Sequence, residues 1–127
     1  MQSSGVGNCI NMFSLIQSCG FPCLVLVTMR GEWEEFNPWQ VPMGSITEEC
    51  LRLAGFSTYR IDQPDRVDEI VRIAVDRAFN DNKAIAIILS QILIGKKDYE
   101  QAFDDVATVK HQRQSFLPIL IGKKDWR

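Results

Sequence analysis

The chain has 127 residues, of which 46% are hydrophobic and 24% are charged, and its formal net charge is −2. This size and composition predict a single globular domain, and the weak net charge gives no electrostatic reason to expect a nucleic-acid partner. The longest apolar runs, around Leu24 and Ile87, have the length of strands, so no membrane span is expected. Because no amino-terminal signal is visible after Met1, we expect a cytoplasmic protein.

The four cysteines lack the close paired spacing of zinc sites, and the chain has one histidine. They are Cys9, Cys19, Cys23 and Cys50. We interpret them as reduced, mostly buried thiols, while a disulfide or metal role stays open on sequence alone. We expect no metal site from this chain, and nothing near the histidine, His111, marks it as the partner of a cysteine nucleophile.

A turn that contains glycine, MQSSGVGN, opens the chain and precedes a predicted helix. Apolar residues at helical spacing and a Gly–Pro stop indicate the helix: Ile10, Phe13, Ile16, Gly20 and Pro22. The turn offers close backbone approach and polar groups near the positive end of the helix dipole. The residues that provide them are Ser3, Ser4, Gly5, Gly7 and Asn8. A ligand site and a tight turn in which Asn8 caps the helix both fit this pattern.

A nearly continuous apolar run over residues 23–28 predicts a strand buried on both faces of a parallel sheet. It leads into residues 29–44, MRGEWEEFNPWQVPMG, which show neither helical nor strand periodicity and predict a long loop. The loop interleaves aromatic residues with polar ones, including Arg30, Asn37 and Gln40. A loop of this kind at a strand end suits a small-molecule site, and a surface loop that only caps the sheet is the alternative.

The remaining elements alternate between helix and strand. Ser45 and Glu48 form a capping-box pattern, which predicts a short helix that Gly55 ends. A strand is expected over residues 57–61, an amphipathic helix from residue 62 onward, and a strand over residues 84–89. This alternation predicts an α/β fold with a parallel sheet and helices on both faces. Ligands of such sheets lie beyond the carboxyl ends of the strands, where the opening turn, the long loop and Ser90–Gln91 should meet.

The last thirty residues carry a repeat. The heptapeptide ILIGKKD occurs at residues 92–98 and again at residues 119–125, with one possible amphipathic helix between the copies. Two copies are too few for a solenoid. The lysine pairs are most simply solvated charge, with anion binding as the alternative. A local duplication or an assembly error explains the repeat at least as well as a function does.

Three stretches together carry a family resemblance: MQSSGVGN at residues 1–8, RGEWEEFNPWQVPMG at residues 30–44 and LSQILIGKK at residues 89–97. They resemble the pyrimidine-binding domain of thiamine diphosphate-dependent decarboxylases, nearest to the alpha-type subunits of the sulfopyruvate and phosphonopyruvate decarboxylase branch. The resemblance covers residues 1–97, so residues 98–127 are expected to be a tail outside it. It implies the thiamine diphosphate-binding fold, of which this chain would lack the first two strands.

The resemblance also implies a reaction and a set of binding residues. The reaction is loss of CO2 from a 2-oxo acid that bears a sulfonate or phosphonate, a carboxy-lyase activity that in the sulfopyruvate case belongs to coenzyme M biosynthesis. The opening turn, Ser3, Ser4, Gly5, Gly7 and Asn8, would lie beside the pyrimidine of the cofactor. Gln2 would lie near the reacting centre, and Arg30, Asn37 and Gln40 would border the substrate. The guanidinium of Arg30 suits the oxygens of a sulfonate or phosphonate.

Two departures from the family qualify this expectation. The acidic residue that activates the cofactor in this family lies on an earlier strand, so the catalytic residue would lie upstream of this chain. The Gly-Asp-Gly…Asn pattern that holds Mg²⁺ and the diphosphate is absent, and a separate beta-type subunit would supply it. We therefore expect this chain alone to be inactive and to work in a hetero-oligomer. The alternative is a non-catalytic binding or regulatory relic of the same domain.

Overall fold

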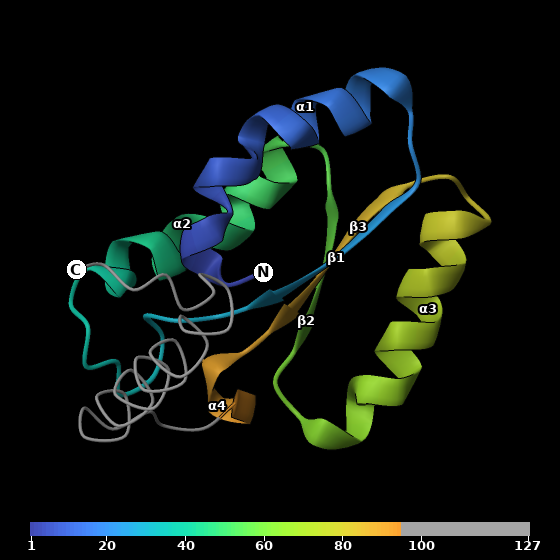
Figure 1. Ribbon diagram of the computed structural model, residues 1–127. Helices are drawn as coiled ribbons and strands as arrows, with labels where there is room; N and C mark the ends of the chain where they lie inside the picture. Colours follow the sequence, from blue (N-terminus) through green and yellow to red (C-terminus); the bar gives the residue numbers. More distant parts are fainter. Residues whose placement is uncertain (95–127) are drawn as a thin grey trace, which may run out of the picture. The chain divides into compact units, whose positions relative to one another are not determined.

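The computed structural model describes residues 1–94, and the structural statements that follow concern this part of the chain (Figure 1). The helices are α1 (Ile10–Cys19), α2 (Gln40–Leu53), α3 (Val67–Phe79) and the short α4 (Gln91–Ile94). The strands are β1 (Cys23–Thr28), β2 (Ser57–Ile61) and β3 (Ala84–Leu89). Single 3₁₀ turns occupy Ser3–Gly5, Gly7–Cys9 and Pro64–Arg66. The predictions for the tail, its helix, the lysine pairs and the second ILIGKKD copy lie outside the described residues, and only residues 92–94 of the first copy, within α4, are described.

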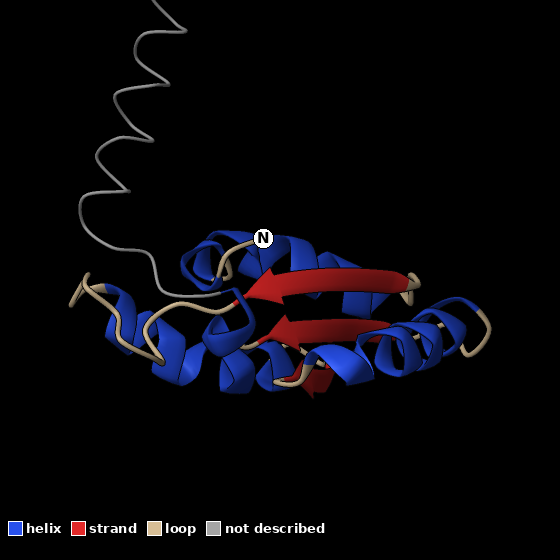
Figure 2. Ribbon diagram, turned by 90° about the horizontal axis from the view of Figure 1, so that it is seen from below, coloured by secondary structure: helices blue, strands red, loops and turns tan. Residues whose placement is uncertain are grey.

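The strands form one parallel sheet in the order β1-β3-β2. Its arrows point the same way in Figure 2. Cys23 is in register with Ala84, and Ser57 is in register with Ile85. Gln2 forms a further parallel bridge with Thr28, so the opening turn starts beside the carboxyl end of β1. The predicted α/β class with an all-parallel sheet is confirmed.

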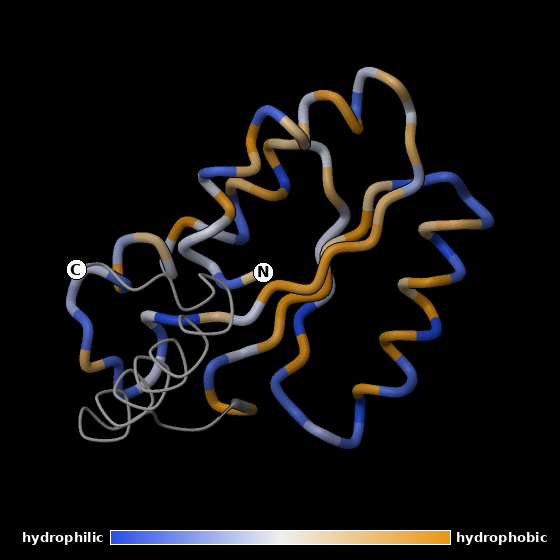
Figure 3. Tube along the Cα trace, viewed as in Figure 1, coloured by the Kyte–Doolittle hydropathy of each residue, from blue (hydrophilic) through white to orange (hydrophobic). Residues whose placement is uncertain are grey.

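The central strand β3 is buried on both faces, which explains why its sequence is continuously apolar. Ala84, Ala86 and Ile88 belong to a core with α1 and α2 that includes Phe13, Val27 and Leu51. Ile85 and Ile87 belong to a second core with α3, formed with Ile61, Ile70, Ala74 and Ala78. Figure 3 shows the apolar residues following the strands. Helices therefore cover both faces of the sheet, as predicted.

The start of α2 differs from the sequence expectation. We predicted a loop to Gly44 and a helix capped by Ser45, but the helix begins at Gln40. The hydroxyl of Ser45 donates to the carbonyl of Pro42 inside the helix (2.8 Å), so the capping box is wrong. Pro42 is compatible with a helix that begins at Gln40, because proline is tolerated in the first turn of a helix, where its missing N–H has no partner to lose.

Two smaller expectations also change. Asn8 does not cap α1, because the N-cap residue is Cys9 and no side chain caps the helix there. The four cysteines are free thiols, as predicted, but three are half-buried and Cys19 is exposed, so "mostly buried" is wrong. Burial raises the pKa of the Cys23 thiol above its usual range.

Within residues 1–94, no helix is both long and apolar enough to cross a membrane.

Candidate functional site

Three segments that lie far apart in the sequence meet at the carboxyl edge of the sheet. The backbone N–H of Arg30 donates to the hydroxyl of Ser3 (3.2 Å), which joins the loop after β1 to the opening turn. The backbone N–H of Glu32 donates to the side-chain oxygen of Gln91 (2.9 Å), which joins the same loop to the end of β3. The structure thus brings together the turn, the loop and the Ser90–Gln91 segment, where ligands of parallel sheets bind.

The carboxylate of Glu35 is the centre of the loop. Its side chain is 2% exposed. It accepts five hydrogen bonds, from Arg30 Nε (2.6 Å), Arg30 Nη2 (2.5 Å), Gly31 N (3.0 Å), Asn37 N (3.1 Å) and Gln91 Nε2 (3.1 Å). The hydrogen bond from Arg30 is the main cause that lowers the pKa of Glu35 to about 2. A carboxylate this well satisfied is charged at neutral pH and fixes the loop around it.

Gln91 connects this carboxylate to the loop backbone on the other side. Its side chain is buried, and its oxygen accepts from the backbone N–H groups of Glu32 (2.9 Å) and Trp33 (3.2 Å). Its own backbone N–H donates to the carboxylate of Glu32 (3.2 Å). One amide side chain therefore accepts from two backbone donors and donates to one buried carboxylate, so Gln91 joins the segment after β3 to the loop.

An outer layer of ion pairs extends the network to β2 and α2. Arg60 donates to Glu32 (2.7 Å) and to Glu48 (2.8 and 3.1 Å). Arg52 also pairs with Glu48 (2.5 Å). These side chains are more exposed than Glu35, so each pair contributes less than a buried one. The arrangement nevertheless joins the carboxyl end of β2 to the loop and to α2.

Two glycines let α2 contact the loop backbone directly. A Cβ at Gly44 would overlap the carbonyl oxygen of Arg30, and a Cβ at Gly31 would overlap the carbonyl of Gln40. Gly31 also has a φ of 80°, which disfavours other residues. The start of α2 is therefore set by backbone contact with Arg30–Gly31, which no local helix signal encodes.

The predicted residues of the opening turn differ in accessibility. Ser3 is fully buried and bonded to Arg30, whereas Ser4, Gly7 and Asn8 are exposed and Gly5 is half-buried. The hydroxyl of Ser4 donates to the side-chain oxygen of Gln2 (3.2 Å), so these two predicted residues lie together.

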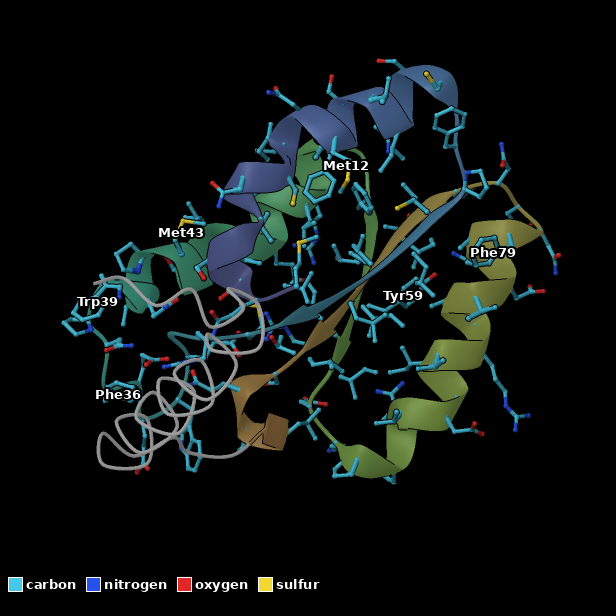
Figure 4. The ribbon with its side chains drawn as sticks, in the orientation of Figure 1. Met12, Phe36, Trp39, Met43, Tyr59 and Phe79 are labelled. Atoms are coloured by element: carbon cyan, nitrogen blue, oxygen red, sulfur yellow. The ribbon has the colours of Figure 1, made fainter. Side chains whose placement is uncertain are left out.

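The predicted substrate residues of the loop lie around Glu35. Arg30 is 14% exposed and paired with Glu35, and Asn37 is half-buried with its backbone bonded to the same carboxylate. Gln40 is half-buried, and its side-chain oxygen is buried without a hydrogen-bond partner within residues 1–94. Phe36 and Trp39 lie at the loop end of α2, and Trp39 is 67% exposed (Figure 4).

Sequence reasoning missed the role of Glu35 and of the Gln91 side chain. One signal in the sequence could have indicated the role of Glu35, because it is a carboxylate next to Phe36 inside a loop rich in aromatic residues. Two cavities of about 320 and 430 Å³ lie elsewhere, one beside Gly20 and Lys83 and one beside Ile10 and Leu53. The candidate site is thus marked by its polar network and not by these cavities.

Comparison with known proteins gives consistent relatives. No protein-family model matches the chain. A sulfopyruvate decarboxylase subunit alpha from Methanocaldococcus jannaschii is 29% identical over 93 residues, which is 72% of this chain and 55% of that protein. The protein of the same name from Methanococcus maripaludis is 30% identical over 93 residues, 72% of this chain and 56% of the relative. The protein of the same name from Methanothermobacter thermautotrophicus is 32% identical over 90 residues, which is 70% of this chain and 54% of the relative.

The chain spans about half the length of the curated relatives it matches. All three carry the same name, and the family suggested by the sequence motifs is the one that they represent. The parallel sheet with helices on both faces is also the kind of fold that this family implies. The matched part of this chain therefore resembles the sulfopyruvate decarboxylase alpha subunits, at about 30% identity over about 70% of its length.

Proposed function

We propose that this chain supplies the pyrimidine-binding and substrate-facing part of a thiamine diphosphate-dependent 2-oxo acid decarboxylase. The reaction is conversion of 3-sulfopyruvate to sulfoacetaldehyde and CO2, a step of coenzyme M biosynthesis in the cytoplasm. The observation that carries this proposal is the similarity to three proteins named sulfopyruvate decarboxylase subunit alpha. Because the chain matches about half of each relative, the activity is assigned to a complete assembly and not to this chain alone.

The opening turn fits the polar edge of an aminopyrimidine ring. Ser4 and Asn8 are exposed side chains with donors and acceptors. A Cβ at Gly7 would meet no heavy atom within 4 Å, so a flat ring has room to approach the backbone there. When bound, thiamine diphosphate would accept the electron pair of the bond to CO2. The residues of this chain would hold the ring edge and keep the adjoining loop in place.

A beta-type partner subunit completes the site in this proposal. The sequence lacks the Gly-Asp-Gly…Asn pattern, and within residues 1–94 no group of three or more His, Cys, Asp or Glu side chains gathers to hold a metal. Mg²⁺ and the diphosphate would therefore be held by the partner. Residues 1–97 would form the pyrimidine-binding part, and residues 98–127 would stand outside the family.

The loop would recognise the acid group of the substrate. Arg30 would carry the charge, Asn37 and Gln40 of the same loop would add amide groups, and Gln2 would contribute from the opening turn. The buried side-chain oxygen of Gln40 has no partner within residues 1–94, but it is an acceptor, so a contact of Gln40 with the acid group would have to come from its amide N–H groups. The same groups suit a phosphonate, so phosphonopyruvate is the alternative substrate.

A chimera tests the proposal. The chain replaces the matched part of the Methanocaldococcus jannaschii alpha subunit, and CO2 release is measured with the beta-type subunit, thiamine diphosphate and Mg²⁺. We expect the chimera to decarboxylate sulfopyruvate or phosphonopyruvate, and the isolated chain to be inactive. A folded chimera that associates with its partner but turns over neither substrate would contradict the proposal and favour a non-catalytic relic.

A further inference from the structure

The pairing of Arg30 with Glu35 uses only one edge of the guanidinium. Nε and Nη2 both donate to the Glu35 carboxylate, in the side-on geometry of a bidentate pair. Nη1 makes no hydrogen bond within residues 1–94, and it is not among the buried atoms that lack a partner, so it reaches the surface. The other edge of Arg30 is therefore still available to an external acceptor.

Glu35 cannot easily move away from this position. Gly31 N and Asn37 N bind it from the loop, and Gln91 Nε2 binds it from the end of β3. The ring of Phe36 lies 5.4 Å from the Arg30 guanidinium carbon and limits that group on one face. Arg30 is thus held on one edge by a fixed carboxylate and is covered on one face by the Phe36 ring.

We propose that Glu35 is a positioning residue that holds Arg30 so that its Nη1 edge binds an oxyanion, the sulfonate or phosphonate of the substrate. This inference rests on the proposed function and extends it to a residue that makes no contact with the substrate. Gln91 supports the arrangement by holding Glu35. The chain of contacts runs from the end of β3 through a buried carboxylate to the anion-binding edge of an arginine.

Positioning and simple electrostatics predict opposite effects for the same change. If Arg30 attracted anions by charge alone, Glu35 would weaken the attraction, and its removal would tighten binding. If Glu35 positions Arg30, its removal lets the guanidinium change rotamer, and binding weakens although the site has become more positive. The substitution E35Q therefore separates the two explanations by the sign of its effect.

The probe is inorganic sulfate, titrated into the full chain at constant ionic strength and followed by NMR of the arginine side chains. We expect a saturable shift of the Arg30 signals in the wild type. In E35Q and in E35D, which keeps the charge but shortens the side chain, affinity should fall at least about tenfold, as for one charged hydrogen bond. The matched control is E49Q. It removes a carboxylate that is 64% exposed and whose oxygen lies 3.9 Å from Arg52 Nη1, and it should leave the affinity for sulfate unchanged.

Equal or tighter sulfate binding by E35Q would overturn the proposal, as would absence of a saturable Arg30 shift in the wild type. If both Glu35 variants unfold, hydrogen exchange in the wild type still tests the proposal. The Arg30 Nε proton should stay protected from exchange when sulfate is bound, because Nε remains hydrogen-bonded to Glu35. Loss of that protection would show that sulfate displaces Glu35, which contradicts positioning. Sulfate binding is independent of turnover, so an inactive chimera with intact sulfate binding would count only against the proposed function.

Discussion

The side-chain amide of Gln91 donates to the carboxylate of Glu35 at 3.1 Å, across a sequence separation of 56 residues. Both side chains are buried, at the point where the loop after β1 meets the end of β3. This contact joins the loop after β1 to the segment that follows β3. Five hydrogen bonds to Glu35 and two backbone donors to Gln91 make the loop a rigid part of the sheet edge.

Replacing Gln91 by leucine should therefore be costly. The Q91L substitution leaves the backbone N–H groups of Glu32 and Trp33 without their acceptor and removes a donor from Glu35. We expect a loss of about 2–4 kcal/mol in the free energy of unfolding, since each buried unsatisfied group costs about 1–3 kcal/mol. Urea unfolding followed by circular dichroism measures it. The matched control is Q63L at an exposed position, which should change stability by less than about 0.5 kcal/mol. Similar small effects for both would show that Gln91 does not anchor the loop.

Gly44 should tolerate no side chain. In G44A the new methyl overlaps the carbonyl oxygen of Arg30, so α2 or the loop must shift. We expect a loss of about 1–3 kcal/mol, the usual cost of overpacking. The control is G7A, because a Cβ at Gly7 meets nothing within 4 Å. Thermal melts of both variants decide, and equal melting temperatures would mean that the close contact between α2 and the loop is not maintained in solution.

The Glu35 carboxylate should make stability depend on pH in acid. Its pKa falls from 4.5 to about 2 on folding, chiefly through the hydrogen bond from Arg30. Because the folded pKa lies below the unfolded one, the stabilisation is fully present above pH 4.5 and is lost as the pH falls towards 2. E35Q removes this titrating group, so the stability difference between wild type and E35Q should shrink over that range. Parallel unfolding curves at several pH values measure it, and a constant difference would contradict the assignment.

The isolated chain should bind thiamine diphosphate weakly or not at all. Most of the charge of the ligand lies in its diphosphate, and the sequence lacks the pattern that holds the diphosphate and Mg²⁺ in this family. Calorimetry with cofactor and Mg²⁺, on the chain with and without a beta-type partner, measures this. Tight binding by the chain alone would remove the need for a partner in the proposed function.

The fold was largely predictable and the site only in outline. The apolar run of β3, Ala84–Leu89, predicts a strand buried on both faces, and the alternation of helices and strands then predicts a parallel sheet. That sheet implies an edge where the turn and the loop meet. The residues that fix the loop could not be read in the same way, because Glu35 and Gln91 carry no local signal of each other.

The misplaced start of α2 has a related cause. Ser45 and Glu48 match a capping box, but Glu48 instead pairs with Arg60 and Arg52. A local pattern cannot anticipate that the Glu48 side chain pairs with Arg60 on β2, which lies 12 residues further along the chain. The glycines that actually set the helix start, Gly31 and Gly44, act through backbone contact between segments.

The most direct test of the account is the effect of R30K on CO2 release by the chimera with its partner, cofactor and Mg²⁺. Sulfopyruvate and pyruvate are compared, because only the first carries the sulfonate. If the edge around Arg30 serves the decarboxylase as proposed, R30K should lower kcat/KM for sulfopyruvate by the equivalent of about 1–3 kcal/mol, the range of a charged hydrogen bond, and leave pyruvate nearly unchanged. Equal losses on both substrates would contradict the account, because Arg30 would then serve only the fold or the cofactor.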